Sequence, residues 1–327
     1  MLRNKYGVGE AYISAYLRKM LGRDLIGEED LQLELSSNPN LANWLDYALS
    51  TNSRGRFFVE FLRPHIGATA RRYLDVGSAY GGFLVAFLEQ GLEVVGLEYD
   101  PALVALCNAN LQECAAKGIY QVVHGSILDQ NLVKRLGTYD IITCIDVIEH
   151  VSDVPLAMQN MVQLLNPGGV IVLQLPNKDS VSNVISDSHF GLFGITLLQH
   201  HDAEQLFVHH FPDKMYDVGE YYRSSYYLDS LRALGCQATT LEPVYRPKTS
   251  EKIKLAPGYI RRLLQFFFRQ ADIPIELRTK VAVRATNHLI SFLVQSVLVF
   301  FVRKRLSAYK SRFIDDVWLI LGRKPTS

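Results

Sequence analysis

Apolar and polar residues follow a repeating pattern through the middle of the chain. Between Arg71 and Leu175, short β-rich apolar runs are separated by segments in which apolar residues recur at helical spacing. The runs are RRYLDV, EVVGLE, IYQVV, DIITCI and GVIVLQL. Continuous apolar strands that alternate with helices are typical of a parallel sheet covered on both faces. The sequence therefore predicts a doubly wound α/β domain here.

Residues typical of helix ends agree with this pattern. A helix that starts at Gly82 is expected to stop at Gly91, because glycine is suited to the left-handed position after a helix. Asp100, followed by Pro101, and Asp153, followed two residues later by Pro155, are typical helix starts. Cap positions and apolar spacing thus indicate the same boundaries, which strengthens the α/β interpretation.

The flanking regions predict further elements. Residues 8–66 have apolar residues at helical spacing, whereas residues 177–219 show no clear period. A helix in EYYRSSYYLDSLRALG, a strand near 237–242 and a last strand in DDVWLILGRK follow. We predict three parts: an N-terminal helical region (1–66), an α/β domain (67–245 plus 313–327) and a helical insertion (246–312). A separate C-terminal helical domain is the alternative to an insertion.

The formal net charge of +1 conceals two opposed regions. The segment 246–312 has 15 Lys/Arg and 3 Asp/Glu, so the rest of the chain carries a net charge of −11. The basic segment also contains LLQFFF, LISFLVQSVLVFFV and RKR. A basic amphipathic helix of this kind is typical of contact with an anionic membrane surface. The alternatives are packing on the acidic remainder of the chain or a homodimer interface. Nucleic acid is least favoured, because the aromatic residues lie in apolar runs.

Other features indicate the cellular compartment. The four cysteines form no CxxC pair, and the N-terminus has no apolar stretch like the core of a signal peptide. The apolar run 289–302 contains Gln295 and Ser296 and is shorter than the roughly 20 residues that span a bilayer. We therefore expect a cytoplasmic protein, with the inner face of a membrane as a peripheral location.

A dense group of small residues follows the first predicted strand, in YLDVGSAYGGF. Glycine costs backbone entropy on folding, so such a cluster indicates close approach of a ligand to the backbone. Glu98 ends the second strand, 21 positions after Gly77, where a carboxylate can accept hydrogen bonds from both hydroxyls of a ribose. This combination predicts an adenosine-containing ligand. The segment GSAYGG also matches the pattern G-x-A-x-x-G, so a nicotinamide dinucleotide is an alternative ligand.

The later strands carry a family resemblance. YDIITCIDVIEHV and LLNPGGVIVLQLPN resemble the fourth-strand and fifth-strand segments of class I S-adenosylmethionine-dependent methyltransferases. The resemblance covers residues 73–177 and implies a seven-stranded sheet with a reversed final hairpin and S-adenosyl-L-methionine as cofactor. It implies that the following residues bind this cofactor, with Asp100 beside Glu98: Asp75, Gly77, Ser78, Ala79, Gly81, Gly82, Glu98, Tyr99, Ser126, Ile127 and Asp146. Ala79 and Ser126 depart from the glycine and aspartate that are common in the family.

The residues after the fourth strand are candidates for chemistry. Asp146, Glu149 and His150 lie at the ligand-binding edge, and histidine is suited to proton transfer near neutral pH. DVIEH is similar to the EVLEH of ubiquinone-pathway O-methyltransferases, some of which bind a divalent metal near this segment. The resemblance makes these three residues candidate ligands, although metal is not the favoured interpretation. A structural role in bracing the following loop is the third reading.

Five histidines fall within 22 residues of the segment without clear period: His189, His200, His201, His209 and His210. Their spacing matches no standard ligand set, so we expect acceptor contact or half-buried packing. His209 and His210 are the leading candidates for contact with the acceptor.

Together these features predict a methyltransferase that uses S-adenosyl-L-methionine. The resemblance favours O-methylation of a hydroxyl group on a small or lipid-linked acceptor, such as a glycan sugar or a quinol. A nicotinamide-dependent oxidoreductase is one alternative, because the glycine pattern also fits that cofactor. The other is a non-catalytic scaffold that binds the cofactor at a membrane surface.

Overall fold

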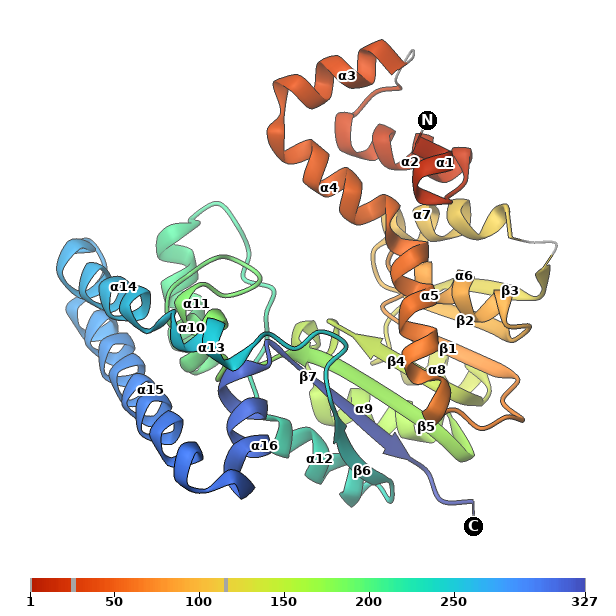
Figure 1. The fold of residues 1–327 in the computed structure, drawn as a ribbon. Coiled ribbons are helices and arrows are strands. Elements are labelled where there is room, and N and C mark those ends of the chain that lie inside the picture. Colours follow the sequence, from red (N-terminus) through yellow and green to blue (C-terminus); the bar gives the residue numbers. More distant parts are fainter. Residues whose placement is uncertain (1, 25–27, 115–116, 327) are drawn as a thin grey trace.

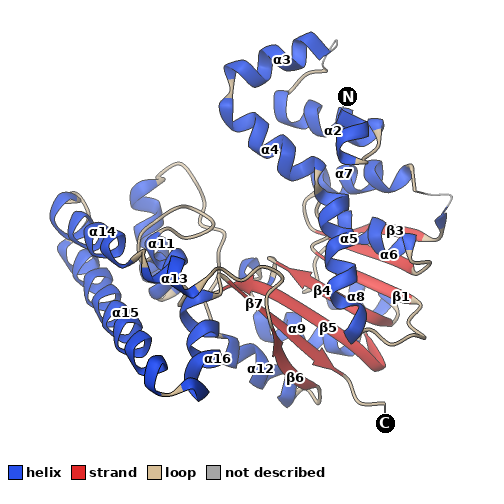
Figure 2. Ribbon diagram, viewed as in Figure 1, coloured by secondary structure: helices blue, strands red, loops and turns tan. Residues whose placement is uncertain are grey.

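A seven-stranded sheet forms the centre of the structure (Figure 2). The computed structural model describes residues 2–24, 28–114 and 117–326. The strand order is β3-β2-β1-β4-β5-β7-β6, and β7 is antiparallel to both neighbours. The strands are β1 (Arg72–Val76), β2 (Glu93–Glu98), β3 (Tyr120–His124), β4 (Tyr139–Ile145), β5 (Leu165–Pro176), β6 (Gln237–Leu241) and β7 (Val317–Arg323). The predicted doubly wound fold with a reversed final hairpin is confirmed.

Helices cover both faces of the sheet. On one face, α8 (Gln130–Leu136), α9 (Val154–Gln163) and α12 (Ser224–Ala233) pack on side chains such as Leu74 and Ile142. On the other face, α5 (Thr51–Leu62), α6 (Gly82–Glu89) and α7 (Pro101–Gln112) pack on Tyr73 and Ile141. Successive strand residues point to opposite faces, so the uninterrupted apolar runs of the sequence fill two separate cores.

The N-terminal helices extend the second of these layers. They are α1 (Leu2–Tyr6), α2 (Glu10–Leu21), α3 (Glu28–Ser37) and α4 (Pro39–Leu49). Buried Tyr12, Tyr16 and Leu45 form a small core with Leu106 of α7, and Figure 1 shows these helices beside α7 at one end of the molecule. The loop after β1 reaches the same core through Tyr80, so the N-terminal helices lie close to the ligand-binding edge of the sheet.

The remaining helices form a second lobe on the opposite side of the sheet (Figure 1). They are α10 (Val181–Ile185), α11 (His200–His210), α13 (Thr249–Ile253), α14 (Ala256–Arg269), α15 (Ile275–Phe301) and α16 (Leu306–Tyr309). One hydrophobic core joins residues 181–221 to residues 259–314. The predicted insertion is helical and lies between β6 and β7, but it shares this core with a segment assigned to the α/β domain. The α11 helix was not predicted.

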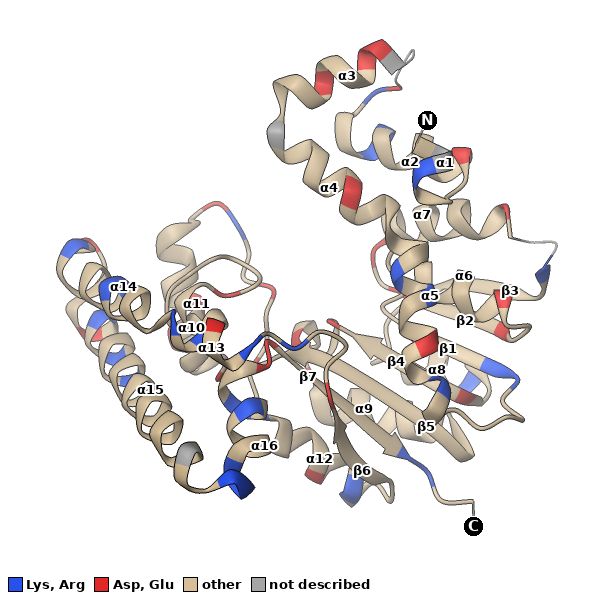
Figure 3. Ribbon diagram, in the orientation of Figure 1, with Lys and Arg blue, Asp and Glu red and all other residues tan. Residues whose placement is uncertain are grey.

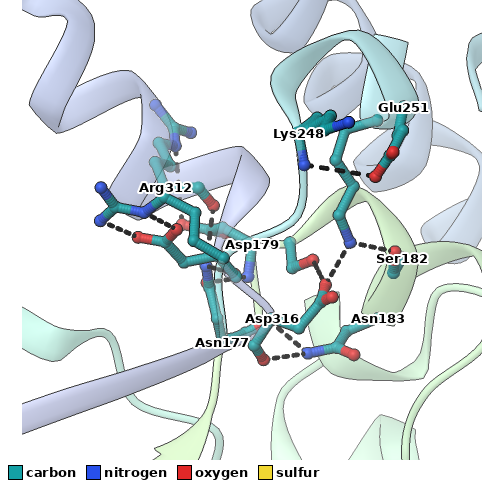
Figure 4. A network of polar contacts seen from close by, with 12 residues as sticks. Asn177, Asp179, Ser182, Asn183, Lys248, Glu251, Arg312 and Asp316 are labelled. Atoms are coloured by element: carbon teal, nitrogen blue, oxygen red, sulfur yellow. Dashed lines mark hydrogen bonds and ion pairs between the residues drawn. The ribbon is translucent and has the colours of Figure 1, made fainter. Parts of the chain in front are cut away.

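A polar network ties the second lobe to the sheet where β5 ends and β7 begins (Figure 4). Asn177 is fully buried, and its side-chain amide donates to the carbonyl oxygens of Ser311, Arg312 and Asp315 at 3.0, 3.1 and 2.6 Å. The side-chain oxygen Oδ1 of Asn177 accepts a hydrogen bond from the backbone N–H of Asp179 at 2.9 Å. Asn177, which directly follows β5, therefore fixes the segment of the chain that leads into β7.

We expect Asn177→Ala to destabilise the fold by about 2–4 kcal/mol, because it leaves several buried backbone groups without a partner. Chemical denaturation of wild type and variant measures this difference. Asn131→Ala on the exposed surface of α8 is the matched control, and we expect a change below about 0.5 kcal/mol. An Asn177→Ala protein as stable as the control would show that the network does not hold the lobe in place.

Candidate functional site

A cavity of about 1150 Å³ opens at the carboxyl ends of the parallel strands. This is the edge at which doubly wound sheets bind their ligands. Small-molecule pockets commonly occupy about 300–1,000 Å³, so the cavity can hold a nucleoside-bearing cofactor and an acceptor together. Its lining includes most of the predicted cofactor residues: Gly77, Ser78, Ala79, Gly82, Glu98, Tyr99, Ser126, Ile127 and Asp146.

Close packing of the chain itself explains the small residues after β1. Gly77 has φ +78°, and a Cβ there would lie 2.2 Å from the Val147 side chain. A Cβ at Gly82 would lie 2.3 Å from the backbone oxygen of Thr51 in α5. Gly81 does not line the cavity and faces Cys107 of α7. Both positions thus admit neighbouring helices, and Gly82 also lines the cavity, so close approach of a ligand to this turn stays a prediction.

Glu98 fixes the shape of the glycine-rich turn. Its carboxylate accepts hydrogen bonds from the backbone N–H groups of Ala79 at 2.8 Å and Asp100 at 2.9 Å. Ala79 has φ +43°, a conformation that costs free energy for a residue with a side chain. Ala79, which departs from the family pattern, thus lies in a turn that the hydrogen bond to the Glu98 carboxylate stabilises. Tyr99, the next residue, is 77% exposed at the rim.

Ser126 and Ile127 form the wall of the cavity between β3 and α8. The Ser126 hydroxyl accepts a hydrogen bond from the backbone N–H of Leu128 at 3.1 Å, which closes a tight turn. Its hydroxyl hydrogen stays available as a donor. Ile127 is buried, and its carbonyl oxygen accepts from the Asn160 side chain at 2.7 Å. The two residues offer a polar and an apolar contact at adjacent positions.

Asp75 lies beneath the turn and is not part of the cavity lining. The hydroxyl of Thr143 donates to its Oδ1 at 2.6 Å, whereas Oδ2 is buried and has no hydrogen-bond partner among the described residues. Burial, together with the negative charge of Glu98, raises the pKa of Asp75 to about 7. Direct contact of Asp75 with a cofactor stays a prediction. Its observed contacts indicate support of the strand end.

This raised pKa predicts a loss of stability as the pH rises from about 4 to about 7. In the unfolded chain an aspartate ionises near pH 3.8, whereas Asp75 in the folded protein stays protonated up to about pH 7. Below pH 3.8 the carboxyl group is neutral in both states, and as the pH rises toward 7 the unfolded state is favoured progressively. We expect Asp75→Asn to gain on the order of 3–4 kcal/mol relative to wild type between pH 4 and pH 8. Urea unfolding at both pH values tests this, with exposed Asp229→Asn as control. Parallel pH dependence of wild type and Asp75→Asn would contradict it.

Helices α4 and α5 cover one side of the cavity, which sequence analysis missed. Tyr47, Arg54 and Phe57 contribute to its lining. The guanidinium of Arg54 lies 3.8 Å from the centroid of the Tyr47 ring and donates to the Tyr47 carbonyl oxygen at 2.8 Å. Among the described residues that line the cavity, Arg54 is the only lysine or arginine. No motif marks these positions, because they come from two helices outside the repeating α/β pattern.

Asp146 follows β4 in a left-handed conformation, with φ +53°. The side-chain amide of Gln174 donates to its Oδ2 at 3.1 Å, and its backbone N–H donates to the Gln174 carbonyl oxygen at 2.9 Å. A non-glycine residue at positive φ is uncommon and is often found at functional sites. The structure thus holds Asp146 at the cavity by contacts with β5.

His150 also lines the cavity, and its tautomer is defined by a backbone contact. Its Nδ1 lies 2.9 Å from the carbonyl oxygen of Asp217, an arrangement in which Nδ1 carries the hydrogen. The other ring nitrogen, Nε2, then has a free lone pair. The Asp217 carboxylate lies 3.8 Å from the same ring. A histidine oriented in this way can accept a proton from a hydroxyl group.

Glu149 and His189 lie next to His150, away from the cavity lining. Glu149 is 2% exposed, and neither carboxylate oxygen has a hydrogen-bond partner in the described part of the chain. Burial, with the negative charge of Asp146, raises its pKa to about 8. One potential ligand atom from each of Glu149, His150 and His189 lies within 4.8 Å of the others. Partnerless carboxylate oxygens beside two imidazoles fit a divalent metal, with His189 in place of the predicted Asp146.

The other predicted histidines lie elsewhere. His209 pairs with Asp272 at 2.8 Å, and His210 accepts a hydrogen bond from the Gln270 side chain at 3.4 Å. Both occupy the end of α11 in the second lobe, and neither lines the main cavity. The structure therefore gives no basis for their predicted contact with an acceptor there. The reason is the unpredicted α11, which carries this part of the chain away from the cavity.

Comparison with known proteins agrees with this geometry. Residues 39–246 match the family described as "Methyltransferase domain". This chain belongs to that methyltransferase family. The predicted resemblance to class I S-adenosylmethionine-dependent methyltransferases is confirmed, and the match includes α4 and α5 as well as the α/β pattern.

Relatives of this methyltransferase are distant. It is 28% identical over 118 residues to the ubiquinone biosynthesis O-methyltransferases of Escherichia coli O7:K1 and Shigella boydii serotype 18, which covers 36% of the chain and 47% of each relative. The chain thus spans about half the length of these curated relatives. A solved SAM-dependent methyltransferase from Archaeoglobus fulgidus superposes with a TM-score of 0.50 at 12% identity, covering 87% of this chain and 99% of that one. That likeness shows the fold.

Proposed function

We propose that this methyltransferase binds S-adenosyl-L-methionine in the main cavity and transfers its methyl group. The Glu98 carboxylate would accept hydrogen bonds from the ribose hydroxyls, as it lies in the cavity at the end of β2. Arg54 would pair with the methionine carboxylate, because it supplies a positive charge beside the glycine-rich turn. Family membership together with a cavity at this edge of the sheet supports the proposal.

We propose a hydroxyl group as the methyl acceptor. Methyl transfer from a sulfonium requires alignment of the acceptor, and a hydroxyl also has to lose its proton. His150 would take that proton at Nε2, with Nδ1 held by the Asp217 carbonyl. This defined tautomer at the cavity wall is the observation that carries the proposal. The curated relatives are named O-methyltransferases, which agrees with it.

The composition of the cavity favours an acceptor with an apolar or aromatic body. Phe57, Phe58 and Phe83 line it on the side of α5 and α6. Aromatic rings of this kind bury flat apolar groups effectively. A quinol or another lipid-carried hydroxyl compound therefore suits the cavity better than an unsubstituted sugar. A divalent ion held by Glu149, His150 and His189 would occupy the same Nε2 of His150, so it is the alternative to proton transfer by this residue and would act as a Lewis acid.

A methyl-transfer assay with radiolabelled cofactor tests the proposal. The purified chain is incubated with the soluble and the lipid fractions of a cell extract, and the labelled product is tested for stability to alkali. We expect label in an alkali-stable ether of an organic-soluble compound. Label in an amine, a thioether or a carboxyl ester would overturn the hydroxyl assignment. Cofactor binding without transfer to any fraction would instead favour the scaffold function.

A further inference from the structure

The α14–α15 hairpin leaves half of its longer helix uncovered. Helix α14 has 14 residues and α15 has 27, or about 21 and 40 Å at the usual rise per residue. Because the two helices run in opposite directions, α14 accompanies the first half of α15, and the second half extends past it (Figure 1). This second half comprises Ile290 to Phe301 and leads into the basic residues Arg303–Arg305.

The second half of α15 has one packed face and one exposed face. Phe292 is fully buried against Tyr309 and Phe313, and the Ser296 hydroxyl donates to the Phe292 carbonyl oxygen. On the other side, apolar residues recur three or four positions apart, as expected for one face of a helix. They are Ile290, Leu293, Val294, Val297 and Phe301, exposed by 54, 41, 52, 59 and 81%. We call these five residues the α15 stripe.

Three exposed basic residues, Arg303, Lys304 and Arg305, follow the α15 stripe directly. None of the three forms an ion pair with an acidic group among the residues that the structure describes. By contrast, Lys280 in the first half of α15 pairs with Asp202 at 2.9 Å. Figure 3 shows Lys and Arg on α14, on α15 and on the segment that follows α15. The α15 stripe thus ends in a concentrated positive charge that the protein leaves unneutralised.

We propose that the α15 stripe and Arg303–Arg305 dock this methyltransferase on an anionic lipid surface. Apolar side chains beside unpaired basic residues fit the boundary between acyl chains and negatively charged headgroups. A symmetrical dimer would place the same surface against itself, and its basic groups would find no acidic partners there. The inference does not depend on the proposed acceptor, although membrane contact would bring a lipid-carried acceptor within reach.

The packing of α15 favours a helix that lies along the surface. Its segment Ile275–Val299 is long and apolar enough to cross a membrane by length and composition alone. However, the Nε2 of His288 lies 2.8 Å from the carbonyl oxygen of Asp179, and Arg284 donates to the Leu197 carbonyl oxygen at 2.6 Å. A crossing helix would lose these contacts with the rest of the lobe. Surface contact through the stripe keeps all of them.

Flotation of the full chain with vesicles tests this inference. We expect the wild type to float with vesicles of equal parts phosphatidylcholine and phosphatidylglycerol, not with pure phosphatidylcholine, and to dissociate as salt rises. Replacement of Arg303, Lys304 and Arg305 by Gln should weaken binding about fivefold per removed charge. Val294→Gln with Val297→Gln should weaken it comparably through lost apolar contact.

Two matched controls guard against general effects of charge and exposed apolar area. Lys134→Gln with Arg135→Gln removes exposed basic groups from α8, and Leu33→Gln removes an apolar side chain that is 68% exposed on α3. Both should float like wild type. Failure of the wild type to float, or full flotation of the stripe and basic variants, would overturn the inference. So would a wild-type dimer that these variants dissociate, because the surface would then join two copies.

Discussion

Glu98→Ala is expected to weaken binding of S-adenosyl-L-methionine at least about 100-fold. Hydrogen bonds to a carboxylate are worth roughly 1.5–3 kcal/mol each, and the ribose offers two hydroxyls to this group. The substitution also removes the acceptor for the N–H groups of Ala79 and Asp100, so the glycine-rich turn loses its shape. Calorimetric titration of the purified variant measures the loss, and Glu98→Gln should retain part of the affinity.

The matched control is Glu93→Ala, at the opposite end of β2. Glu93 is 38% exposed at its side chain and pairs with Arg72 at 3.2 Å, so it shares the strand with Glu98 but not the cavity. Its affinity should stay within about twofold of wild type. Thermal unfolding of each variant separates loss of binding from loss of fold. A folded Glu98→Ala protein with unchanged affinity would contradict the role of this carboxylate.

His150→Ala is expected to reduce methyl transfer by about 100- to 10,000-fold with little change in cofactor affinity. A positioned general base commonly contributes an effect of this size, and the cofactor itself needs no deprotonation. The measurement is single-turnover transfer to the acceptor fraction identified with labelled cofactor. Calorimetry on the same preparation shows whether cofactor binding survives.

His209→Ala serves as the control for His150. Sequence analysis put both histidines at the acceptor, whereas the structure pairs His209 with Asp272 outside the main cavity. His209→Ala should therefore transfer methyl groups at close to the wild-type rate. Equal activity of the His150 variant and wild type would remove His150 as the base. A large loss in His209→Ala alone would move the acceptor to the second lobe.

Sequence patterns predict the α/β layers well because the inner strands β1, β2, β4, β5 and β7 are mostly buried on both faces. Apolar runs such as DIITCI are stable only when they are buried inside the sheet. Asp100 and Asp153 cap their helices through side-chain hydrogen bonds, as expected. The segment around α11 is different. Its aromatic and histidine residues pack on helices more than 50 positions later in the chain. The spacing of apolar residues within this segment does not indicate packing on a partner so far along the chain.

The candidate site shows the same difference between residues that local pattern predicts and residues placed by tertiary packing. Glu98, Ser126 and His150 were found because each lies at or shortly after the end of a predicted strand, and the ends of parallel strands converge at one edge of the sheet. Arg54 was missed because α5 reaches the cavity only through tertiary packing on α6. The glycine cluster lies beside the cavity as predicted, and at Gly82 close packing on the backbone of α5 is a second reason for glycine. Spacing alone does not distinguish a bound ligand from a closely packed helix.

The central claim is that one cofactor occupies the cavity between the glycine-rich turn and Glu98. Titration of the wild-type chain with S-adenosyl-L-methionine, followed by competition with S-adenosyl-L-homocysteine, tests it most directly. We expect saturable binding of one molecule per chain, with mutually exclusive binding of the two compounds. Absence of binding by the folded protein, or saturable binding of a reduced nicotinamide dinucleotide in its place, would contradict it.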